Sequence, residues 1–164
     1  MSQPQAMLLL LILAVLGTPA FCSENYYGRT TGTHFCTSIP EGKNLTGIRM
    51  YVRNNIIMGV QMKHGDQWGS LYGYSDGSLE ELELNDGEDI MSLYGSYNSY
   101  MRQIVLYTTR PRDKIFGTAK ANNEFTDYPQ DPSHVLLGFC GYYVRGGFKA
   151  ISAKWGSPGG KCTE

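Results

Sequence analysis

Hydrophobic and polar residues alternate along much of the chain with the period of a β-strand. In residues 48–53 every second residue is apolar, and Asn54-Asn55 then marks a turn. The alternation resumes in residues 58–63 and stops at the turn residues 64–66. Because successive side chains of a strand point to opposite faces, this pattern predicts a hairpin with one apolar face.

Similar segments recur down the chain, separated by residues typical of turns. Residues 78–84, SLEELEL, have helical propensity, but they lie between two Asp-Gly turns, so we predict a strand there. Residues 119–133 are polar and contain prolines, which indicates a long loop. Further strands are expected at residues 68–74, 90–97, 101–109, 115–117, 134–144 and 148–155.

About ten to twelve short strands without an amphipathic helix predict an all-β fold. Hydrophobic periodicity leaves a sandwich, a barrel and a prism open. Three short segments in successive thirds of the chain are weakly similar, and such a repeat is typical of threefold pseudo-symmetry. The three segments are residues 47–50, 103–106 and 150–153.

The amino-terminal segment has the pattern of a secretory signal peptide. An apolar run at residues 7–16 is followed by small residues. Its roughly ten residues are about half of what a membrane-spanning helix needs. We expect residues 1–22 to be removed by cleavage after Cys22, with cleavage after Ala20 as the alternative.

One secreted domain is expected after that segment. About 140 residues remain, enough for a single domain with a sizeable core, which we place at residues 23–157. Residues 158–164 are expected to form a short flexible tail. No second apolar run predicts a membrane span, and the net charge of −1 argues against nucleic acid as a partner. We therefore expect an extracellular protein, held in secretory granules before release.

Export permits glycosylation and disulfides. The sequon at residues 44–46 lies between two glycines, which indicates a glycosylated Asn44 on an exposed turn. If Cys22 leaves with the signal peptide, three cysteines remain. We favour a disulfide between Cys36 and Cys140, because each lies within a strand-like segment. Cys162 would then be unpaired or would join two chains in a homodimer.

Motifs of common enzyme classes are absent from the sequence. There is no GxSxG elbow, no HExxH and no phosphate-binding GxxxxGK[ST]. Carboxylates cluster at residues 80–89, in and around a turn, where we interpret them as a solvated acidic edge rather than a glycosidase pair or a calcium loop. The three histidines are scattered, and no Cys/His spacing fits zinc. We therefore expect no catalysis, no metal and no cofactor.

Twelve tyrosines, many of them near predicted turns, are the best indication of a ligand. A sugar offers hydroxyls for hydrogen bonds and C–H faces that pack on aromatic rings, so tyrosine suits shallow carbohydrate sites. Tyrosine is also a common strand residue, and a purely structural role is the alternative.

A set of short motifs follows in fixed order along the chain. They are Gly47-Ile48-Arg49, residues 57–61, Asp66-Gln67-Trp68, Leu79-Glu80-Glu81, Asp86-Gly87-Glu88, Gly95-Ser96-Tyr97, Tyr107-Thr108-Thr109, Phe116-Gly117 and residues 151–156. Together they resemble the jacalin-related lectins over nearly all of residues 27–156. The resemblance is strongest to mammalian exocrine members, namely the zymogen granule lectins and the common salivary and demilune-cell-and-parotid group. It implies a β-prism I of three four-stranded Greek-key sheets with pseudo-threefold symmetry, and a carbohydrate-binding protein of salivary-type secretions.

The resemblance also implies a carbohydrate site built from three loops. Mannose-binding members of the family use a glycine-rich loop, a recognition loop and a GxxxD loop whose aspartate contacts sugar hydroxyls. By position, the candidate residues are Gly28 and Gly32 in the first loop, Tyr97 and Asn98 in the second, and Arg145, Gly146, Gly147, Phe148 and Lys149 in the third.

Two of these loops depart from the family pattern. The first keeps only Gly28 and Gly32, whereas in the third Arg145 replaces a glycine and Lys149 replaces the aspartate. A carboxylate accepts hydrogen bonds, but an ammonium only donates them. We therefore predict that the protein prefers acidic glycans, sulfated or sialylated, to mannose. The alternative is a non-lectin secreted mucosal or signalling protein that acts through protein contacts.

Overall fold

The chain folds into β-strands throughout the part that the structure describes. The computed structural model describes residues 25–118 and 120–160, and no helix occurs there. Its strands are β1 (Tyr27–Gly28), β2 (Thr33–Cys36), β3 (Leu45–Arg53), β4 (Ile56–His64), β5 (Gln67–Gly73), β6 (Ser78–Glu83), β7 (Ile90–Tyr97), β8 (Met101–Thr108), β9 (Asp113–Phe116), β10 (Asn123–Asp127), β11 (Val135–Val144) and β12 (Gly147–Gly156). The all-β prediction is therefore confirmed.

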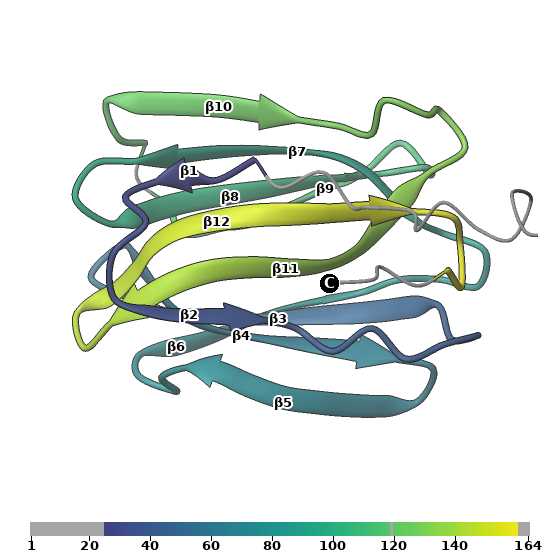
Figure 1. The fold of residues 1–164 in the computed structure, drawn as a ribbon, viewed down its shortest axis with the longest axis horizontal. Helices are drawn as coiled ribbons and strands as arrows, with labels where there is room; N and C mark the ends of the chain where they lie inside the picture. Colours follow the sequence, from purple (N-terminus) through teal and green to yellow (C-terminus); the bar gives the residue numbers. More distant parts are fainter. Residues whose placement is uncertain (1–24, 119, 161–164) are drawn as a thin grey trace, which may run out of the picture.

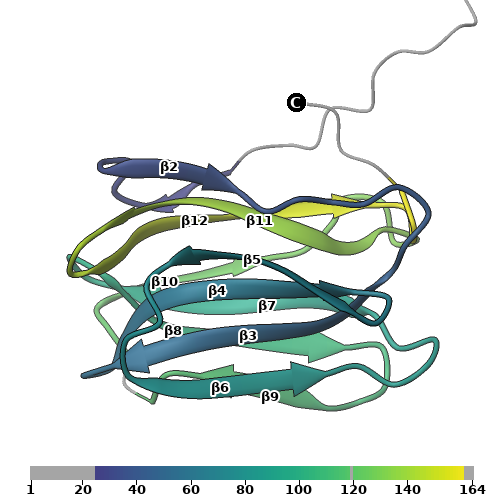
Figure 2. The same cartoon turned by 90° about the horizontal axis from the view of Figure 1, so that it is seen from below.

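The strands form three four-stranded antiparallel sheets arranged as a prism (Figure 1, Figure 2). Sheet 1 has the order β1-β12-β11-β2, sheet 2 the order β10-β7-β8-β9, and sheet 3 the order β5-β4-β3-β6. In sheets 2 and 3, four consecutive strands take the Greek-key order, with the fourth strand beside the first. Sheet 1 has the same order if β11 and β12 are followed by β1 and β2. The three Greek-key sheets expected from the resemblance are therefore confirmed.

The β3–β4 hairpin shows how the alternating pattern becomes structure. Asn54 and Asn55 have φ angles of 51° and 57°, as the two central residues of a type I′ turn require. The apolar residues Ile48 and Met50 are fully buried. On the other side of β3, the edge strand β6 pairs antiparallel with it, so the strand predicted at residues 78–84 is confirmed.

The expectation of a long loop at residues 119–133 is wrong, because β10 lies within it. β10 pairs with β7 at the edge of sheet 2. Among its five residues only Phe125 is buried, so this polar edge strand has almost no alternating apolar signal. Gly95 makes room for that ring, since a Cβ at Gly95 would lie 2.3 Å from a ring carbon of Phe125.

The acidic stretch at residues 80–89 is not solvated throughout. The side chain of Glu88 is fully buried, which corrects the interpretation of this stretch as a solvated edge. Arg112 donates two hydrogen bonds of 2.6 Å to its carboxylate, and Thr108 donates a third of 2.7 Å. A buried carboxylate needs such partners, so Glu88 is a structural residue.

Aliphatic, methionine and phenylalanine side chains fill the core between the sheets. Phe116, Phe139 and Phe148 are among the largest fully buried side chains. A disulfide joins Cys36 of β2 to Cys140 of β11, which lie opposite each other in the ladder. The bridge favoured from the sequence is therefore present, and its two cysteines are 104 positions apart.

Some expectations concern residues outside the described part of the chain. These are the signal peptide at residues 1–22, the pairing of Cys162, and most of the tail at residues 158–164, and they stay predictions. Asn44 is exposed immediately before β3, and its glycosylation also stays a prediction. Among the described residues, no helix is long and apolar enough to cross a bilayer.

Candidate functional site

The three candidate loops lie together at one end of the prism, which we call the loop end. They are the β1–β2 loop at residues 28–32, the β7–β8 turn at residues 97–101 and the β11–β12 turn with its flanks at residues 144–149. The first and third lie at the left of Figure 1. Contacts between the loops join segments that are far apart in the chain.

The β1–β2 loop is held tightly against sheet 1. Gly28 and Gly32 have φ angles of 106° and 109°, which side chains rarely adopt. A Cβ at Gly28 would lie 2.3 Å from the Lys149 carbonyl oxygen. The backbone N–H of Arg29 donates a 2.9 Å hydrogen bond to the same oxygen. Both glycines thus allow a close backbone approach to the protein itself, and the Arg29 N–H is already used.

The β7–β8 turn is organised by the side chain of Asn98. Its Oδ1 accepts hydrogen bonds from Tyr100 N (3.1 Å) and from Arg102 Nε (3.3 Å). Arg102 also donates through Nη1 to the Asn54 carbonyl oxygen at 3.2 Å, which ties this turn to the β3–β4 hairpin. Asn98 therefore fixes the shape of the turn, and it is itself exposed.

The β11–β12 turn carries two cations that lie over tyrosine rings. The Nζ of Lys149 is 4.4 Å from the ring centroid of Tyr100, and the Cζ of Arg145 is 5.0 Å from that of Tyr74. Both distances fall within the range of a cation–π interaction. Gly146 lies against the Tyr100 hydroxyl, where a Cβ would approach within 2.5 Å. Tyr100 therefore links the second loop to the third.

Two of the predicted aromatic residues lie inward rather than at the surface. Phe148 is fully buried, 5.2 Å from the ring of Phe35 between centroids. Tyr97 is half-buried, and its ring packs beside Phe125 with a centroid separation of 6.1 Å. The ring of Phe148 therefore supports the β11–β12 turn from the core.

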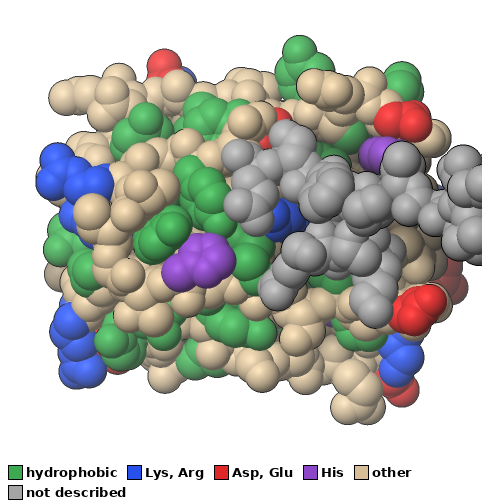
Figure 3. Space-filling view, viewed as in Figure 1, with side chains coloured by type: hydrophobic (Ala, Val, Ile, Leu, Met, Phe, Trp, Pro, Cys, Tyr) green, Lys and Arg blue, Asp and Glu red, His purple; other side chains and the backbone are tan. Residues whose placement is uncertain are grey.

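The loop end is basic. Arg29, Arg102, Arg145 and Lys149 lie in or beside the three loops, whose residues include no Asp or Glu. Arg29 and Arg145 are exposed, whereas Arg102 and Lys149 are half-buried. Figure 3 shows Lys and Arg side chains gathered at this end. Clustered charges of one sign attract counter-ions and charged ligands of the opposite sign.

Carboxylates close to this end are paired with other cations. Asp76 lies 3.3 Å from Arg53. Glu124 lies 3.3 Å from Lys120 and accepts a hydrogen bond from the Tyr94 hydroxyl. The hydrogen bonds from Tyr94 and Lys120 lower the pKa of Glu124, so this carboxylate stays ionised. Within the described residues, none of the four loop cations forms an ion pair.

Four residues of this arrangement are not among those predicted from the sequence. Arg29 and Tyr100 lie inside the predicted loops, and Arg102 lies just beyond the second, so their positions were a usable signal. Tyr74 has no such local signal. It meets Arg145 through the fold, and its ring also packs edge-on against Tyr143, with centroids 5.8 Å apart.

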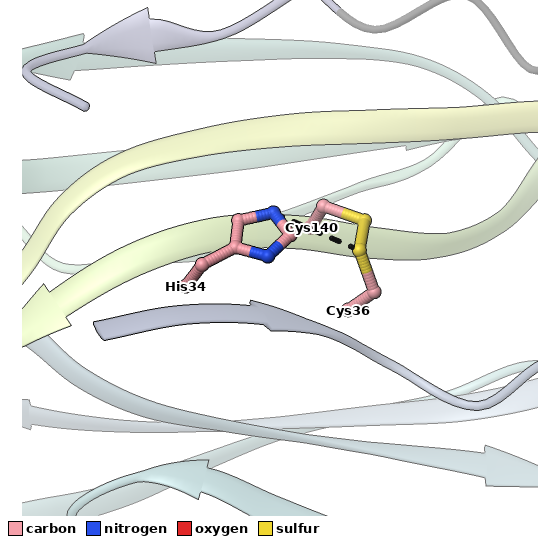
Figure 4. Close-up of side chains that lie close together, drawn as sticks. All are labelled: His34, Cys36 and Cys140. Carbon is pink, nitrogen blue, oxygen red and sulfur yellow. Dashed lines mark hydrogen bonds between the residues drawn. A yellow bond between two sulfur atoms is a disulfide. The ribbon is translucent and has the colours of Figure 1, made fainter. Parts of the chain in front are cut away.

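One group of side chains has the composition of a metal site. Ligand atoms of His34, Cys36 and Cys140 lie within 4.8 Å of one another (Figure 4). The two sulfurs are bonded to each other, so neither is the thiolate that zinc requires. The ring of His34 lies 2.8 Å from the Tyr26 hydroxyl and packs beside Tyr142. In this oxidised form the group is an aromatic cluster beside a disulfide.

Most of the chain matches a known protein family. The model of the jacalin-like lectin domain matches residues 24–154. The chain belongs to the jacalin-like lectin family. Jacalin-like lectins bind carbohydrate and are not enzymes, which supports the expectation that this chain is not a catalyst.

Relatives of this jacalin-like lectin include proteins of two kinds. Rat zymogen granule membrane protein 16 is 34% identical over 113 residues, which are 68% of this chain and 65% of the relative. Mouse prostatic spermine-binding protein is 28% identical over 159 residues, which are 92% of this chain and 76% of the relative. The chain thus spans slightly less than two thirds of the length of the rat protein.

Solved structures of jacalin-like lectins share the architecture. A prostate-specific WGA16 glycoprotein lectin has a TM-score of 0.74 and 31% identity, covering 82% of this chain and 99% of its own. Artocarpin, a lectin with mannose specificity, has a TM-score of 0.69 and 14% identity, covering 84% and 99%. At 14% identity the second likeness shows the fold alone, and that fold is the β-prism predicted from the resemblance.

Proposed function

We propose that the loop end binds carbohydrate on glycans or glycoproteins and prefers acidic or sulfated glycans to mannose. The observation that carries this proposal is Lys149, which occupies the place of the aspartate in mannose-binding relatives. Its ammonium can donate hydrogen bonds to a sulfate or carboxylate but accepts none from sugar hydroxyls.

The surroundings of Lys149 support an anionic ligand. Arg145 lies in the β11–β12 turn just before Lys149, and the two cations lie over tyrosine rings that restrict their positions. A cation held in place loses less side-chain entropy when it binds an anion than a freely rotating one. Arg29, exposed on the adjacent loop, adds a third positive charge with no ion-pair partner among the described residues.

A glycan array tests this proposal. We expect the wild-type protein to bind sulfated and sialylated glycans above mannose-rich ones. In Lys149→Asp that signal should fall by about tenfold, equivalent to 1.4 kcal/mol. The matched control is Lys114→Asp on β9, which makes the same charge change at a half-buried lysine outside the loops and should retain binding. Binding to the mannose-rich panel with none to acidic glycans contradicts the proposal.

The name of the mouse relative raises spermine as a ligand. Spermine is a polycation, and Arg29, Arg145 and Lys149 at the loop end would repel it. We therefore expect spermine titrated alone into the purified protein to cause no saturable shift of the backbone amide NMR signals of residues 28–32, 97–102 and 144–149. Saturable shifts of those signals with spermine would show that the loop end takes cations.

The proposed setting is an exocrine, salivary-type secretion, with storage in secretory granules before release. The apolar segment at residues 7–16 and the similarity to zymogen granule membrane protein 16 support it. Expression in a secretory cell line should deliver the protein to the medium with an amino-terminus near Ser23. Retention of the protein inside the cells with residues 1–22 intact would contradict this setting.

The second candidate is a non-lectin protein that acts through protein contacts on the lectin scaffold. The exchange of the family aspartate for Lys149 favours it, because that exchange removes a sugar-binding group. This candidate includes a dimer joined through Cys162. A band at twice the monomer mass on a non-reducing gel, lost on reduction and in Cys162→Ser, would support the dimer. A monomer that binds acidic glycans would exclude it.

A further inference from the structure

A concavity, which we call the lateral cleft, lies between two sheets of the prism, away from the loop end. One wall is β5, the edge strand of sheet 3, and the other is residues 37–43, which follow β2 at the edge of sheet 1. The buried side chains of Met62 and His64 form its floor. The cleft encloses about 110 Å³ and is partly open to solvent. Its lining includes His64 and Gln67, which flank the β4–β5 turn at the opposite end of the strands from the loop end.

The rim of the lateral cleft offers polar groups that the protein does not use. The hydroxyls of Ser38 and Ser70 and the amide of Gln67 are exposed and line the cleft. None of these three side chains hydrogen-bonds to another described residue. The ring of Tyr72 adds an aromatic surface beside them. This combination of free hydroxyl and amide groups with an aromatic face resembles the lining of shallow carbohydrate sites.

His64 adds a hydrogen-bond acceptor at the floor. Its side chain is 5% exposed, and its Nε2 donates to the Leu137 carbonyl oxygen at 3.2 Å. Because the carbonyl can only accept, Nδ1 is left as the acceptor of the neutral ring, and it has no partner among the described residues. Burial lowers the pKa of His64, so the ring is neutral at physiological pH.

The side chain of Trp68 is fixed at the edge of the same cleft. The guanidinium of Arg49 lies over its ring, with Cζ 3.8 Å from the centroid. Arg49 is itself held by Glu81, with Nε 2.5 Å from Oε2. A ring restrained on one side in this way loses little freedom when a ligand packs near it.

We infer that the lateral cleft is a second binding site, which takes one neutral sugar ring at the end of a glycan. The hydroxyls of a pyranose match the polar side chains of the rim, Ser38, Gln67 and Ser70, and the acceptor His64 Nδ1. Its apolar C–H face matches the ring of Tyr72. The enclosed volume is well below the roughly 300–1,000 Å³ of pockets for drug-sized ligands, so it accepts one ring rather than a chain. This inference does not depend on the ligand proposed for the loop end.

Other ligand classes fit the cleft less well. Its lining contains no Asp or Glu, so a polyamine finds no carboxylate there. Lys43 is its one lysine or arginine, in contrast to the four cations at the loop end, so a polyanion has little to bind. Neutral hydroxyl groups are the best match to the unpaired donors and acceptors.

Backbone amide NMR of the mature protein tests the inference. Single sugars, namely mannose, galactose, fucose and N-acetylglucosamine, are titrated into protein carrying Asn44→Gln. That substitution prevents a glycan on Asn44 from standing beside Lys43 at the rim. We expect at least one sugar to cause saturable shifts at residues 62–72, in the millimolar range of a small, partly exposed ligand.

Paired variants assign those shifts to the cleft. Ser70→Trp should fill the cleft and abolish them, whereas Ser78→Trp should not, because Ser78 is an exposed serine on the other edge strand of sheet 3. Gln67→Ala should weaken binding by about three- to tenfold, the loss expected for one hydrogen bond. Lys149→Asp should leave the shifts at residues 62–72 unchanged.

Two results would overturn the inference. One is the absence of saturable shifts at residues 62–72 with every sugar. The other is a set of shifts that Ser70→Trp and Ser78→Trp reduce equally, because that would place the ligand outside the cleft. Loss of acidic-glycan binding in Lys149→Asp with the cleft shifts intact separates the two sites.

Discussion

Lys149 shows how one residue changes the chemistry that the family resemblance implies for a loop. The exchange could be predicted from the sequence, because the loop that contains Lys149 corresponds by position to a family loop with an aspartate there. The contact that restrains the Lys149 side chain could not be predicted. Tyr100 comes from a different sheet and meets Lys149 only through the fold. The same holds for Arg145 and Tyr74. Motif comparison can therefore name a charged residue, whereas the ring that positions it depends on tertiary contacts.

The restraint of Lys149 by Tyr100 has a measurable consequence. Tyr100→Leu removes the aromatic face and keeps an apolar side chain beside Gly146. A cation–π interaction at an exposed site contributes about 0.5–1 kcal/mol, so affinity for a sulfated glycan should fall by about two- to fivefold. Isothermal titration calorimetry measures this, with Tyr107→Leu on the exposed face of β8 as the control. Equal affinities for Tyr100→Leu and the wild type would show that the ring does not position Lys149.

Most of the strands and turns of the fold could be predicted from the sequence. The alternation of apolar and polar residues predicts the β3–β4 hairpin. The Asp-Gly turns on either side of residues 78–84 predict β6. β10 was missed because it has one buried residue and pairs at a sheet edge, where its polar side chains face solvent. The burial of Glu88 could not be predicted from the sequence for a related reason. Its burial depends on Arg112 from a turn 24 positions away.

The Glu88–Arg112 pair joins the β6–β7 turn to the β8–β9 turn, and it should make stability depend on pH. Hydrogen bonds from Arg112, Asn85 and Thr108 lower the pKa of Glu88 in the folded protein. The unfolded chain, with an ordinary glutamate pKa near 4.3, therefore binds the proton more readily. The stabilisation is complete above that value and is lost as the pH falls below it toward the lower folded pKa.

Glu88→Gln tests this link by removing the titrating group. The free energy of unfolding, measured by urea denaturation, should fall by about 1.5–3 kcal/mol at neutral pH. The difference from the wild type should shrink as the pH falls below about 4. Glu41→Gln, at an exposed residue, serves as the control. A constant difference at all pH values would mean that the charge of Glu88 does not stabilise the fold.

The disulfide between β2 and β11 should matter for the edge of sheet 1. Replacing Cys36 and Cys140 together by alanine removes a covalent link across 104 positions of sequence. The expected loss is about 2–5 kcal/mol in the free energy of unfolding, the usual range for a native disulfide in a small secreted domain. Guanidinium denaturation with and without a reductant measures it. The wild type should lose stability on reduction, whereas the double variant should not respond.

The whole molecule has an uneven charge distribution that its composition conceals. The net charge is −1, yet the loop end gathers four cations without a paired carboxylate among the described residues. Figure 3 shows Asp and Glu side chains toward the opposite end. The near-neutral net charge follows directly from the sequence. The separation of charge does not, because Arg29, Arg102, Arg145 and Lys149 come from distant parts of the chain.

Such a charge cluster predicts a strong dependence of glycan binding on salt. Raising the ionic strength from about 0.1 M to 1 M shortens the Debye length from about 10 Å to 3 Å, so contacts between exposed charges weaken. Affinity for a sulfated glycan should therefore fall by about tenfold or more, as measured by surface plasmon resonance. Sugar binding in the lateral cleft should change little over the same range, since it does not depend on charge. Salt-independent binding of the sulfated glycan would contradict an electrostatic loop end.

Sheet 1 combines strands from both ends of the domain, and this sets the order in which the three sheets can form during synthesis. Sheets 2 and 3 each use four consecutive strands, so each can form as soon as its own stretch of chain has left the ribosome. Sheet 1 needs β1 and β2 together with β11 and β12, so its early strands must wait for nearly the whole domain to be synthesised. Contacts of such long sequence separation are slow to form. The loop end, which joins Arg29 to Lys149, is therefore among the last features of the nascent protein to be assembled.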